Sequence, residues 1–373
     1  MGISKYVLVA LAVVGLFSIW RGVSESTLSG DVGNVCYSSV AVPNVAYTQT
    51  KYQRLSEESK KPPLIDSNNS KSIQPILQPE RYISNDPYLE EQWALQYIHA
   101  PELWQVTAGN SQILVAVLDT GIDQHHEDLC GKIVADVNFT SSQTMKDVLG
   151  HGTHVAGIIA ASRNNDLGIA GLAPESSLLN VKVANDKGQS TVSAVAEGII
   201  WAVDKGASVI NMSIALEEYS SQLEDAVRYA WNRGAVIIAA AGNSGSKLTV
   251  YPAFFENCIA VTALRQDGTL APLSNHGDWV DIAAPGLNIY STLPGNSYGY
   301  KSGTSFATAY VSGLAALLFN VVSDNNYNGR LNDEVRVAIE AGYPVLDEQG
   351  VGRGCIDATS SLIAGYDTNC VTK

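Results

Sequence analysis

Three short segments of the chain carry side chains that together could perform nucleophilic acyl transfer. Asp119 follows a continuous apolar run, His151 lies in a glycine-flanked segment that leads into an apolar helix, and Ser305 opens another long apolar helix. A serine nucleophile needs a base that accepts its proton and an acid that orients the base and stabilises its charged form. The three residues in these settings therefore predict a Ser-His-Asp hydrolytic site.

Such a site also needs hydrogen-bond donors that stabilise the developing oxyanion. The backbone amide of Ser305 is one candidate, because the first N–H groups of a helix have no partner within the helix. The side chain of Asn243 is the second candidate, since it lies on a loop that Gly242 loosens.

Each segment also has an ordinary structural interpretation when it is taken alone. An Asp-Thr-Gly sequence after a strand is common in turns, and Gly-Thr-Ser before a helix is common as an N-cap. His151 and His154 are three residues apart and could share a metal, but no third ligand and no glutamate accompany them at the spacing of a zinc peptidase. The hydrolytic interpretation therefore depends on the three segments and Asn243 occurring together.

A second serine motif spans residues 295–299 and fits the Gly-x-Ser-x-Gly nucleophile elbow of α/β-hydrolases. That fold places its histidine after the serine in the chain, whereas no histidine follows His276. Pro294 and the adjacent glycines are also incompatible with a strand-to-helix elbow. We therefore expect residues 295–299 to form a glycine-rich surface loop.

Strand-like and helix-like patterns alternate after residue 85. Apolar runs typical of buried parallel strands occupy residues 113–118, 178–183, 209–212, 236–240 and 259–261. Helical patterns occupy residues 155–161, 192–205 and 223–233. The alternation predicts a three-layer α/β fold with a mostly parallel central sheet flanked by helices. Active residues gather at the carboxyl ends of strands in such sheets, where Asp119 and Asn211 both fall.

The ends of the chain differ from this pattern. Residues 1–24 combine Lys5 with an apolar run, which suits a signal peptide; an uncleaved membrane anchor is the alternative, although the run is short for a span. Residues 25–84 are polar and interrupted by prolines, so we expect a pro-segment or a flexible linker. The folded domain is expected over residues 85–366, followed by a C-terminal tail over residues 367–373.

Charge and cysteine content exclude some partners. The chain has 37 acidic and 23 basic side chains and a net charge of −14, which repels nucleic acid and anionic membrane surfaces. We expect no nucleic-acid partner and no stable membrane insertion. Five cysteines leave at least one unpaired, and none has zinc-site spacing. Cys355 and Cys370 could close a short C-terminal loop.

The segments around Asp119, His151 and Ser305, in this chain order, resemble the signature blocks of the subtilisin-like (subtilase) serine peptidases. Residues 85–88 and 100–104 are similar to the thermitase-like branch in particular. The resemblance implies a secreted serine endopeptidase that hydrolyses proteins or peptides through an acyl-enzyme on Ser305. It assigns Asp119 as the orienting acid, His151 as general base and then acid, and Asn243 to the oxyanion hole, whereas His154 matches a structural position.

The resemblance also implies a groove in which the substrate adds as a strand between two edges of the enzyme. The residues that match these edges are Asp186, Lys187, Gly188, Ser213, Ile214 and Ala215. The P1 side chain would lie between the second edge and Ala240, Ala241 and Gly242, above a floor residue that is often glycine in the family. That floor residue is Val250 here, and Ala215 stands where glycine is common. Both add bulk to the pocket, or else shifts of the surrounding loops absorb it.

A structural calcium ion is the cofactor that the resemblance implies. Asp86, Asp128 and Asn165 match side-chain ligands of the family's strong calcium site, and hard oxygen ligands from separate segments suit Ca²⁺. The alternative is that these are solvated turn residues.

Two other classes of function remain to be weighed. A catalytically inactive subtilase homologue would serve as a binding module, but the intact set of Asp119, His151, Ser305 and Asn243 argues against it. An exported structural or adhesive protein is disfavoured, because the sequence has no internal repeat. We therefore expect an active, secreted endopeptidase that works as a monomer.

Overall fold

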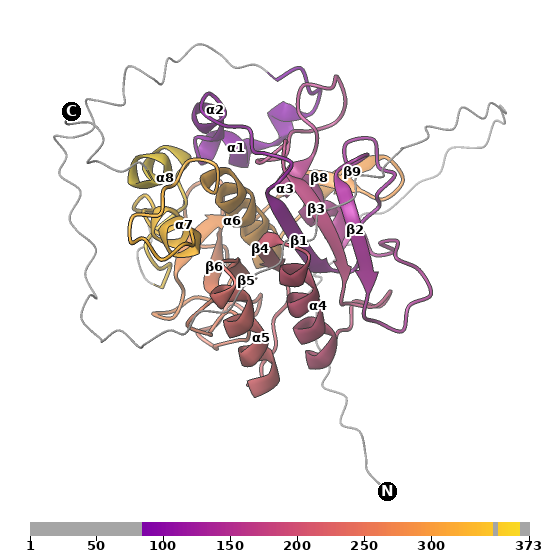
Figure 1. Cartoon of the computed structure of the whole chain (residues 1–373). Coiled ribbons are helices and arrows are strands. Elements are labelled where there is room, and N and C mark those ends of the chain that lie inside the picture. Colours follow the sequence, from indigo (N-terminus) through magenta and orange to yellow (C-terminus); the bar gives the residue numbers. More distant parts are fainter. Residues whose placement is uncertain (1–83, 346–349, 366–373) are drawn as a thin grey trace, which may run out of the picture.

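The computed structural model describes residues 84–345 and 350–365. The expected signal peptide, nearly all of the expected pro-segment and the C-terminal tail lie outside the described residues. Within them, seven parallel strands form one sheet in the order β2-β3-β1-β4-β5-β6-β7, with helices on both faces (Figure 1). The three-layer α/β fold predicted from the sequence is confirmed.

The strands of this sheet are β1 (Leu114–Asp119), β2 (Ile133–Asn138), β3 (Ser177–Lys182), β4 (Ala207–Met212), β5 (Val236–Ala240), β6 (Ile259–Leu264) and β7 (Ile282–Pro285). An antiparallel hairpin is formed by β8 (Ile289–Leu293) and β9 (Ser297–Lys301). The helices are α1 (Trp93–Tyr97), α2 (Ala100–Leu103), α3 (His151–Ala160), α4 (Val192–Asp204), α5 (Ser221–Asn232), α6 (Thr304–Leu318), α7 (Asn332–Ile339) and α8 (Ala358–Gly365), with a 3-10 turn at Leu89–Glu91. None of the described helices is long and apolar enough to cross a membrane.

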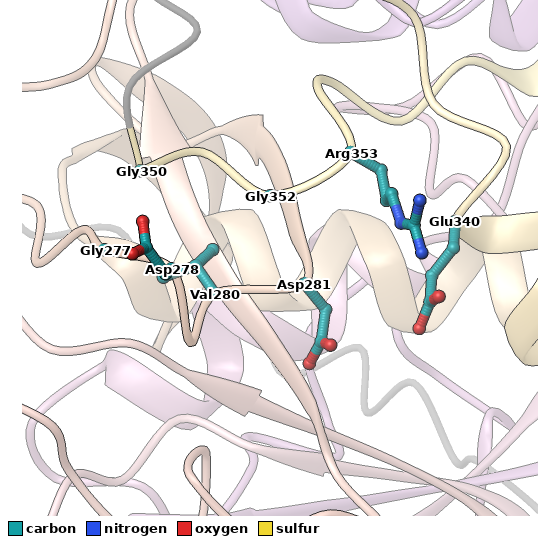
Figure 2. A pocket seen from close by; sticks show the side chains of 8 residues that line it. All are labelled: Gly277, Asp278, Val280, Asp281, Glu340, Gly350, Gly352 and Arg353. Carbon is teal, nitrogen blue, oxygen red and sulfur yellow. The ribbon is translucent and has the colours of Figure 1, made fainter. Parts of the chain in front are cut away.

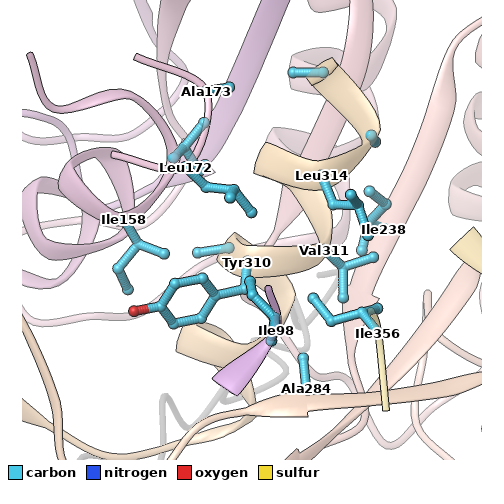
Figure 3. Close-up of a cluster of buried hydrophobic side chains, with 14 of the residues drawn as sticks. Ile98, Ile158, Leu172, Ala173, Ile238, Ala284, Tyr310, Val311, Leu314 and Ile356 are labelled. Carbon is cyan, nitrogen blue, oxygen red and sulfur yellow. The ribbon is translucent and has the colours of Figure 1, made fainter. Parts of the chain in front are cut away.

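Two hydrophobic layers enclose the sheet, and β1 contributes to both. Val115 and Val117 belong to the layer that contains α3 and α6, whereas Ala116 and Leu118 belong to the layer that contains α4 and α5. A strand that is buried on both faces has a continuous apolar sequence, which explains the uninterrupted run before Asp119. Figure 3 shows the first layer, where Tyr310 of α6 lies among apolar side chains with its ring near Ile158.

The sequence patterns missed β2, β7 and the β8–β9 hairpin. β2 is a partly exposed edge strand, and β7 has only four residues and ends at a proline. The prediction of a surface loop at residues 295–299 was wrong in part, because Ser297 to Gly299 pair with β8 as the start of β9. Gly295 and Asn296 have φ values of 79° and 53°, and this left-handed backbone turns the chain between the two strands.

The suggested Cys355–Cys370 disulfide was also wrong. Cys355 is a free thiol, 3% exposed, in the core, and its backbone pairs with that of Tyr343. Cys258 is likewise free and buried, whereas Cys130 is disulfide-bonded.

Candidate active site

The carboxyl end of β1 and the start of α3 bring Asp119 and His151 together. The Nδ1 atom of His151 lies 2.7 Å from Oδ1 of Asp119, and the two side chains are only 8% and 1% exposed. The backbone N–H of Thr120 donates to the same oxygen at 2.7 Å, which holds the carboxylate in place. Because Nδ1 faces the acid, the Nε2 atom of His151 is the ring nitrogen left for proton transfer.

Asp147, which the sequence analysis did not single out, anchors the beginning of α3. Its carboxylate accepts from the backbone N–H groups of Gly150 and Thr153, both at 2.8 Å, and from the hydroxyl groups of Thr120 and Thr153, also at 2.8 Å. A carboxylate at a helix N-terminus accepts hydrogen bonds from N–H groups that lack intrahelical partners, and the helix dipole stabilises its negative charge. Its position four residues before His151, where the helix starts, was the available sequence signal.

Lys182 is a second positioning residue that was missed. It is fully buried at the end of β3, where its ammonium donates to the carbonyl oxygen of Thr120 and pairs with Asp186 at 3.0 Å. The buried cation therefore fixes the backbone directly after Asp119. A lysine inside an apolar strand is unusual enough to have been a signal, because buried charges are normally paired.

Ser305 is the second residue of α6 and is 5% exposed. The next residue, Phe306, packs between the two histidines, with ring centroids 5.4 Å from His151 and 4.6 Å from His154. Ser305 and His151 thus lie at the N-terminal ends of two helices that pack together.

A buried chain of hydrogen bonds supports the backbone at Ser305. The hydroxyl of Ser213 donates to the carbonyl oxygen of Ser305 at 3.2 Å, and Asn211 donates to Ser213 at 3.1 Å. Ser312, about two turns further along α6, donates to Asn211 at 2.9 Å. The strand β4 is thereby tied to the start of α6.

Asn243 is oriented by the same helix start. Its Oδ1 atom accepts from the backbone N–H of Thr304 at 2.8 Å and from the Thr304 hydroxyl at 3.1 Å. The occupied oxygen leaves the Nδ2 group as a free donor. Gly303 lies directly beside it, since a Cβ atom at position 303 would come within 3.3 Å of Nδ2.

His154 has a different environment from His151. It is fully buried, its Nε2 atom lies 3.0 Å from the carbonyl oxygen of Gly299, and burial lowers its pKa to about 3. A neutral ring fixed between α3 and β9 is suited to packing rather than to proton transfer. Within residues 84–345 and 350–365, no group of three His, Cys, Asp or Glu side chains could hold a metal ion.

Several of the residues expected to form the P1 pocket lie close to one another in the structure. Leu216, which follows the Ser213–Ile214–Ala215 edge, exchanges two backbone hydrogen bonds with Tyr251, at 2.8 and 2.7 Å. Val250 is 4% exposed, and a Cβ atom at Gly242 would lie 3.7 Å from its Cγ1 atom. Ala240 and Ala241 are buried as well. This arrangement is compatible with Val250 as the pocket floor.

The other expected edge of the groove is formed by residues of a turn in the structure. Asp186, Lys187 and Gly188 form a turn, closed by hydrogen bonds from Gly188 N–H to the Asn185 carbonyl and from Asn185 N–H to the Gln189 carbonyl, both at 2.8 Å. The Asn185 side chain reinforces the turn, because its oxygen accepts from the backbone of Lys187 and Gln189. Residues 186–188 therefore form a turn, and their role as a substrate edge stays a prediction.

Asp86, Asp128 and Asn165 are brought together by the structure. The Asn165 side chain donates to Asp128 at 2.9 Å, and its backbone N–H donates to Asp86 at 3.2 Å. Both carboxylates are buried, 4% and 0% exposed, and burial raises the pKa of Asp128. Ile169 and Tyr298 add donors to Asp128, at 2.9 and 3.0 Å.

Comparison with known proteins bears directly on this arrangement. The sequence profile described as the Subtilase family matches residues 110–339. The chain belongs to the subtilase family. The matched region contains the Asp119–His151 pair, Asn243 and Ser305, the same residues that the fold assembles at one edge of its sheet.

Among individual relatives, this subtilase is 47% identical over 258 residues to the "Thermophilic serine proteinase" of Bacillus sp. (strain AK1), covering 69% of this chain and 63% of that protein. It is 44% identical over 261 residues to "Thermitase" of Thermoactinomyces vulgaris, covering 69% and 91%. It is 42% identical over 227 residues to "Subtilisin Savinase" of Lederbergia lenta, covering 61% and 83%. The chain therefore spans less than two thirds of the length of the Bacillus relative. The likeness to the thermitase-like branch predicted from the sequence is confirmed.

Proposed function

We propose that this subtilase is a secreted serine endopeptidase that forms an acyl-enzyme on Ser305. The observation that carries the proposal is the buried 2.7 Å contact between Asp119 and His151 at the start of α3, a helix that packs against the one carrying Ser305. The relatives named serine proteinase, thermitase and subtilisin support the same chemistry.

In the proposed reaction His151 accepts the proton of the Ser305 hydroxyl while Oγ attacks the carbonyl carbon of the scissile bond. The tetrahedral oxyanion is stabilised by the Ser305 backbone N–H and the Nδ2 group of Asn243. The Oδ1 atom of Asn243 is held by the backbone N–H of Thr304. Asp119 stabilises the imidazolium, which then protonates the leaving amine. Water attacks the acyl-enzyme by the reverse of these steps and releases the second product.

The substrates are proteins or peptides that lie as an extended strand beside residues 213–215. Their P1 side chain enters the pocket between this edge and residues 240–242. Because Val250 occupies the floor beside Gly242, small and medium apolar P1 side chains fit better than aromatic ones.

A calcium ion held by Asp86, Asp128 and Asn165 fits the donor chemistry of this region. Two buried carboxylates lie close to one amide without a basic partner in the hydrogen bonds described above, and burying unpaired charge is costly. Ca²⁺ would neutralise them and connect three separate segments of chain. Chelation by EGTA is expected to lower the melting temperature of wild type and to have little effect on Asp128→Ala; equal melting temperatures with and without EGTA in wild type would remove the site.

Endopeptidase activity is tested with a proteome-derived peptide library incubated with the purified protein. Mass spectrometry should identify internal cleavage sites with a preferred P1 residue, and the Ser305→Ala variant should produce none. An unchanged library in the presence of folded wild-type protein would favour the alternative of an inactive binding module.

A further inference from the structure

A polar loop joins α6 to α7, and its residues 324–329 read Asp-Asn-Asn-Tyr-Asn-Gly. Side-chain oxygens at alternate positions before a glycine are typical of calcium loops of the EF-hand type. That motif ends with a glutamate at its twelfth position, which is Val335 here, whereas Asp333 and Glu334 come directly before it. The fold must therefore decide whether these acids meet the loop.

Hydrogen bonds from its own backbone close the loop. The carboxylate of Asp324 accepts from the N–H groups of Asn328 at 3.1 Å and Gly329 at 2.8 Å. The Oδ1 atom of Asn326 also accepts from the N–H of Asn328, at 3.0 Å. Gly329 has a φ value of 79°, a left-handed conformation that glycine adopts without strain. Both oxygens of Asp324 are thus engaged in folding the loop.

The first turn of α7 brings two carboxylates to this loop. The Oδ2 atom of Asp333 accepts from the amide groups of Asn326 and Asn328, at 2.5 and 2.7 Å. The Oε1 atom of Glu334 accepts from the backbone N–H groups of Asn325 and Asn326, at 3.2 and 3.3 Å. Acids are also favoured at a helix start by the helix dipole, so their presence alone does not indicate a ligand.

The second oxygen of each carboxylate does point to a ligand. Oδ1 of Asp333 and Oε2 of Glu334 are buried atoms without a hydrogen-bond donor, and so is Oδ1 of Asn332, a side chain that is 0% exposed. Among the described residues, no lysine or arginine forms an ion pair with Asp333 or Glu334. Burial and the neighbouring Asp333 carboxylate raise the pKa of Glu334. Buried acceptors without donors are costly, and a cation would satisfy them together.

We propose that this loop binds a calcium ion through the carboxylates of Asp333 and Glu334, with the amide oxygens of Asn326 and Asn328 as further ligands. A half-turn of each amide exchanges its Nδ2 group for its oxygen, so the two amides can change from donors to Asp333 into ligands of the ion. Two acidic side chains belong to this site, and amides complete it in place of a third. Ca²⁺ suits such a mixed set, because it accepts oxygen ligands in flexible geometry, whereas Mg²⁺ demands a near-ideal octahedron.

An ion at this position would fasten the loop after α6 to the start of α7. The two helices pack against each other, and α6 is the helix that carries Ser305 near its beginning (Figure 1). The ion is far along the chain from the reacting groups and supplies no step of the proposed reaction. Its expected effect is therefore on stability.

The test counts the calcium bound by the full chain carrying Ser305→Ala, which prevents autolysis. In equilibrium dialysis, adding Asp333→Asn with Glu334→Gln should remove one bound Ca²⁺ per molecule and reduce the rise in melting temperature that Ca²⁺ produces. The dissociation constant of this ion is expected at about 10⁻⁴–10⁻³ M, the range of extracellular modules. Glu224→Gln with Asp225→Asn is the matched control, since it removes the same charges from a pair near the start of α5 that bonds to Tyr219 and Arg228. The control should bind as many ions as the parent.

A second variant keeps the test decisive if the acidic pair is needed for folding. Asn326→Ala with Asn328→Ala changes only the loop, and should weaken the binding of one ion at least ten-fold. Unchanged number and affinity in a folded variant of either pair would overturn the inference. Loss of the same ion in the control would also overturn it, because surface charge alone would then explain the binding. The calcium site proposed above is present in all of these proteins, so its failure would change the total and leave the difference intact.

Discussion

Polar side chains are stabilised differently at the two ends of the parallel strands, which are called here the carboxyl edge and the other, amino-terminal edge of the sheet. At the carboxyl edge, Asp119 and His151 meet in a buried pair that is held by neutral hydrogen bonds. Near the start of β7, at the other edge, a cavity of about 420 Å³ opens between the chain before β7 and the segment after α7 (Figure 2). It is lined by Gly277, Asp278, Val280, Asp281, Glu340, Gly350, Gly352 and Arg353.

Charges at the second edge are paired in a partly exposed network. Arg336 of α7 lies 3.0 Å from Asp281 and 2.6 Å from Glu340, and it also donates to the carbonyl oxygen of Glu256 at 2.8 Å. These contacts tie α7 to the sheet. The comparison teaches that the hydrogen bonds around Asp119 leave His151 with a ring nitrogen available for the proposed proton transfer, whereas the ion pairs of Arg336 at the other edge serve stability.

The largest expected effect comes from removing the reacting groups of the first edge. Ser305→Ala or His151→Ala should lower kcat by about 10⁶ without loss of the fold, a magnitude that was measured on subtilisin itself. Kinetics on a peptide substrate measure kcat, and circular dichroism measures whether the fold is retained. His154→Ala is the informative control: if it abolishes activity in a folded protein and His151→Ala does not, the assignment of the base is wrong.

Loss of the oxyanion donor should have the next largest effect. Asn243→Ala removes the Nδ2 group and should lower kcat by about 10²–10³ with little change in KM, again a magnitude taken from subtilisin. The Thr304 backbone also loses its acceptor, so the melting temperature must be measured alongside. A KM effect with unchanged kcat would mean that Asn243 binds substrate and does not stabilise the transition state.

The pocket floor should control the choice of P1 residue. A β-branched side chain at position 250 cannot easily move aside, and overpacking costs about 1–3 kcal/mol. Ala, Val or Leu at P1 should therefore exceed Phe and Tyr in kcat/KM by roughly 10–200-fold. Val250→Gly should restore efficient cleavage after aromatic P1 residues. Turnover of Phe by wild type as fast as that of Leu would show that Val250 does not limit the pocket.

At the second edge, a change should affect stability alone. Arg336→Met leaves Asp281 without its cation, and since burial already raises the pKa of Asp281, we expect a loss of about 1–3 kcal/mol in the free energy of unfolding. Activity on peptides should stay at the wild-type level. Arg228→Met, which removes an exposed pair with Asp225, should change little. A loss of kcat in Arg336→Met would contradict the division between the two edges.

His154 links the catalytic edge to the pH dependence of stability. Its folded pKa of about 3 lies below the ordinary value of 6.5, so its contribution is present above pH 6.5 and is lost as the pH falls from 6.5 toward 3. The loss should be at most about 1.4 kcal/mol for each pH unit. Urea unfolding of Ser305→Ala at pH 7, 5.5 and 4.5, with and without His154→Asn, measures it. If the free energy of unfolding changes equally with pH in the two proteins, His154 is not the cause of the pH dependence.

Sequence patterns predicted the parts of the fold that burial dictates. The runs that became β1, β3, β4, β5 and β6 are buried on both faces, so their apolar character shows directly in the sequence. The short β7 and the partly exposed β2 have no such pattern.

The candidate site was predictable only in part. Asp119, His151 and Ser305 lie in segments with recognisable neighbours, whereas Asp147 and Lys182 act through hydrogen bonds to backbone that only the fold brings near them. The turn at residues 186–188 depends on hydrogen bonds to the Asn185 side chain, which the sequence pattern alone does not indicate.

The central claim is that Ser305 is the nucleophile activated by the Asp119–His151 pair. A fluorophosphonate probe reacts with an activated serine, and mass spectrometry of the digested protein locates the modified residue. We predict one label per folded molecule, on Ser305, and none on Ser305→Ala or His151→Ala. A folded wild-type protein that cleaves peptides but carries the label on another residue, or carries none, would contradict the claim.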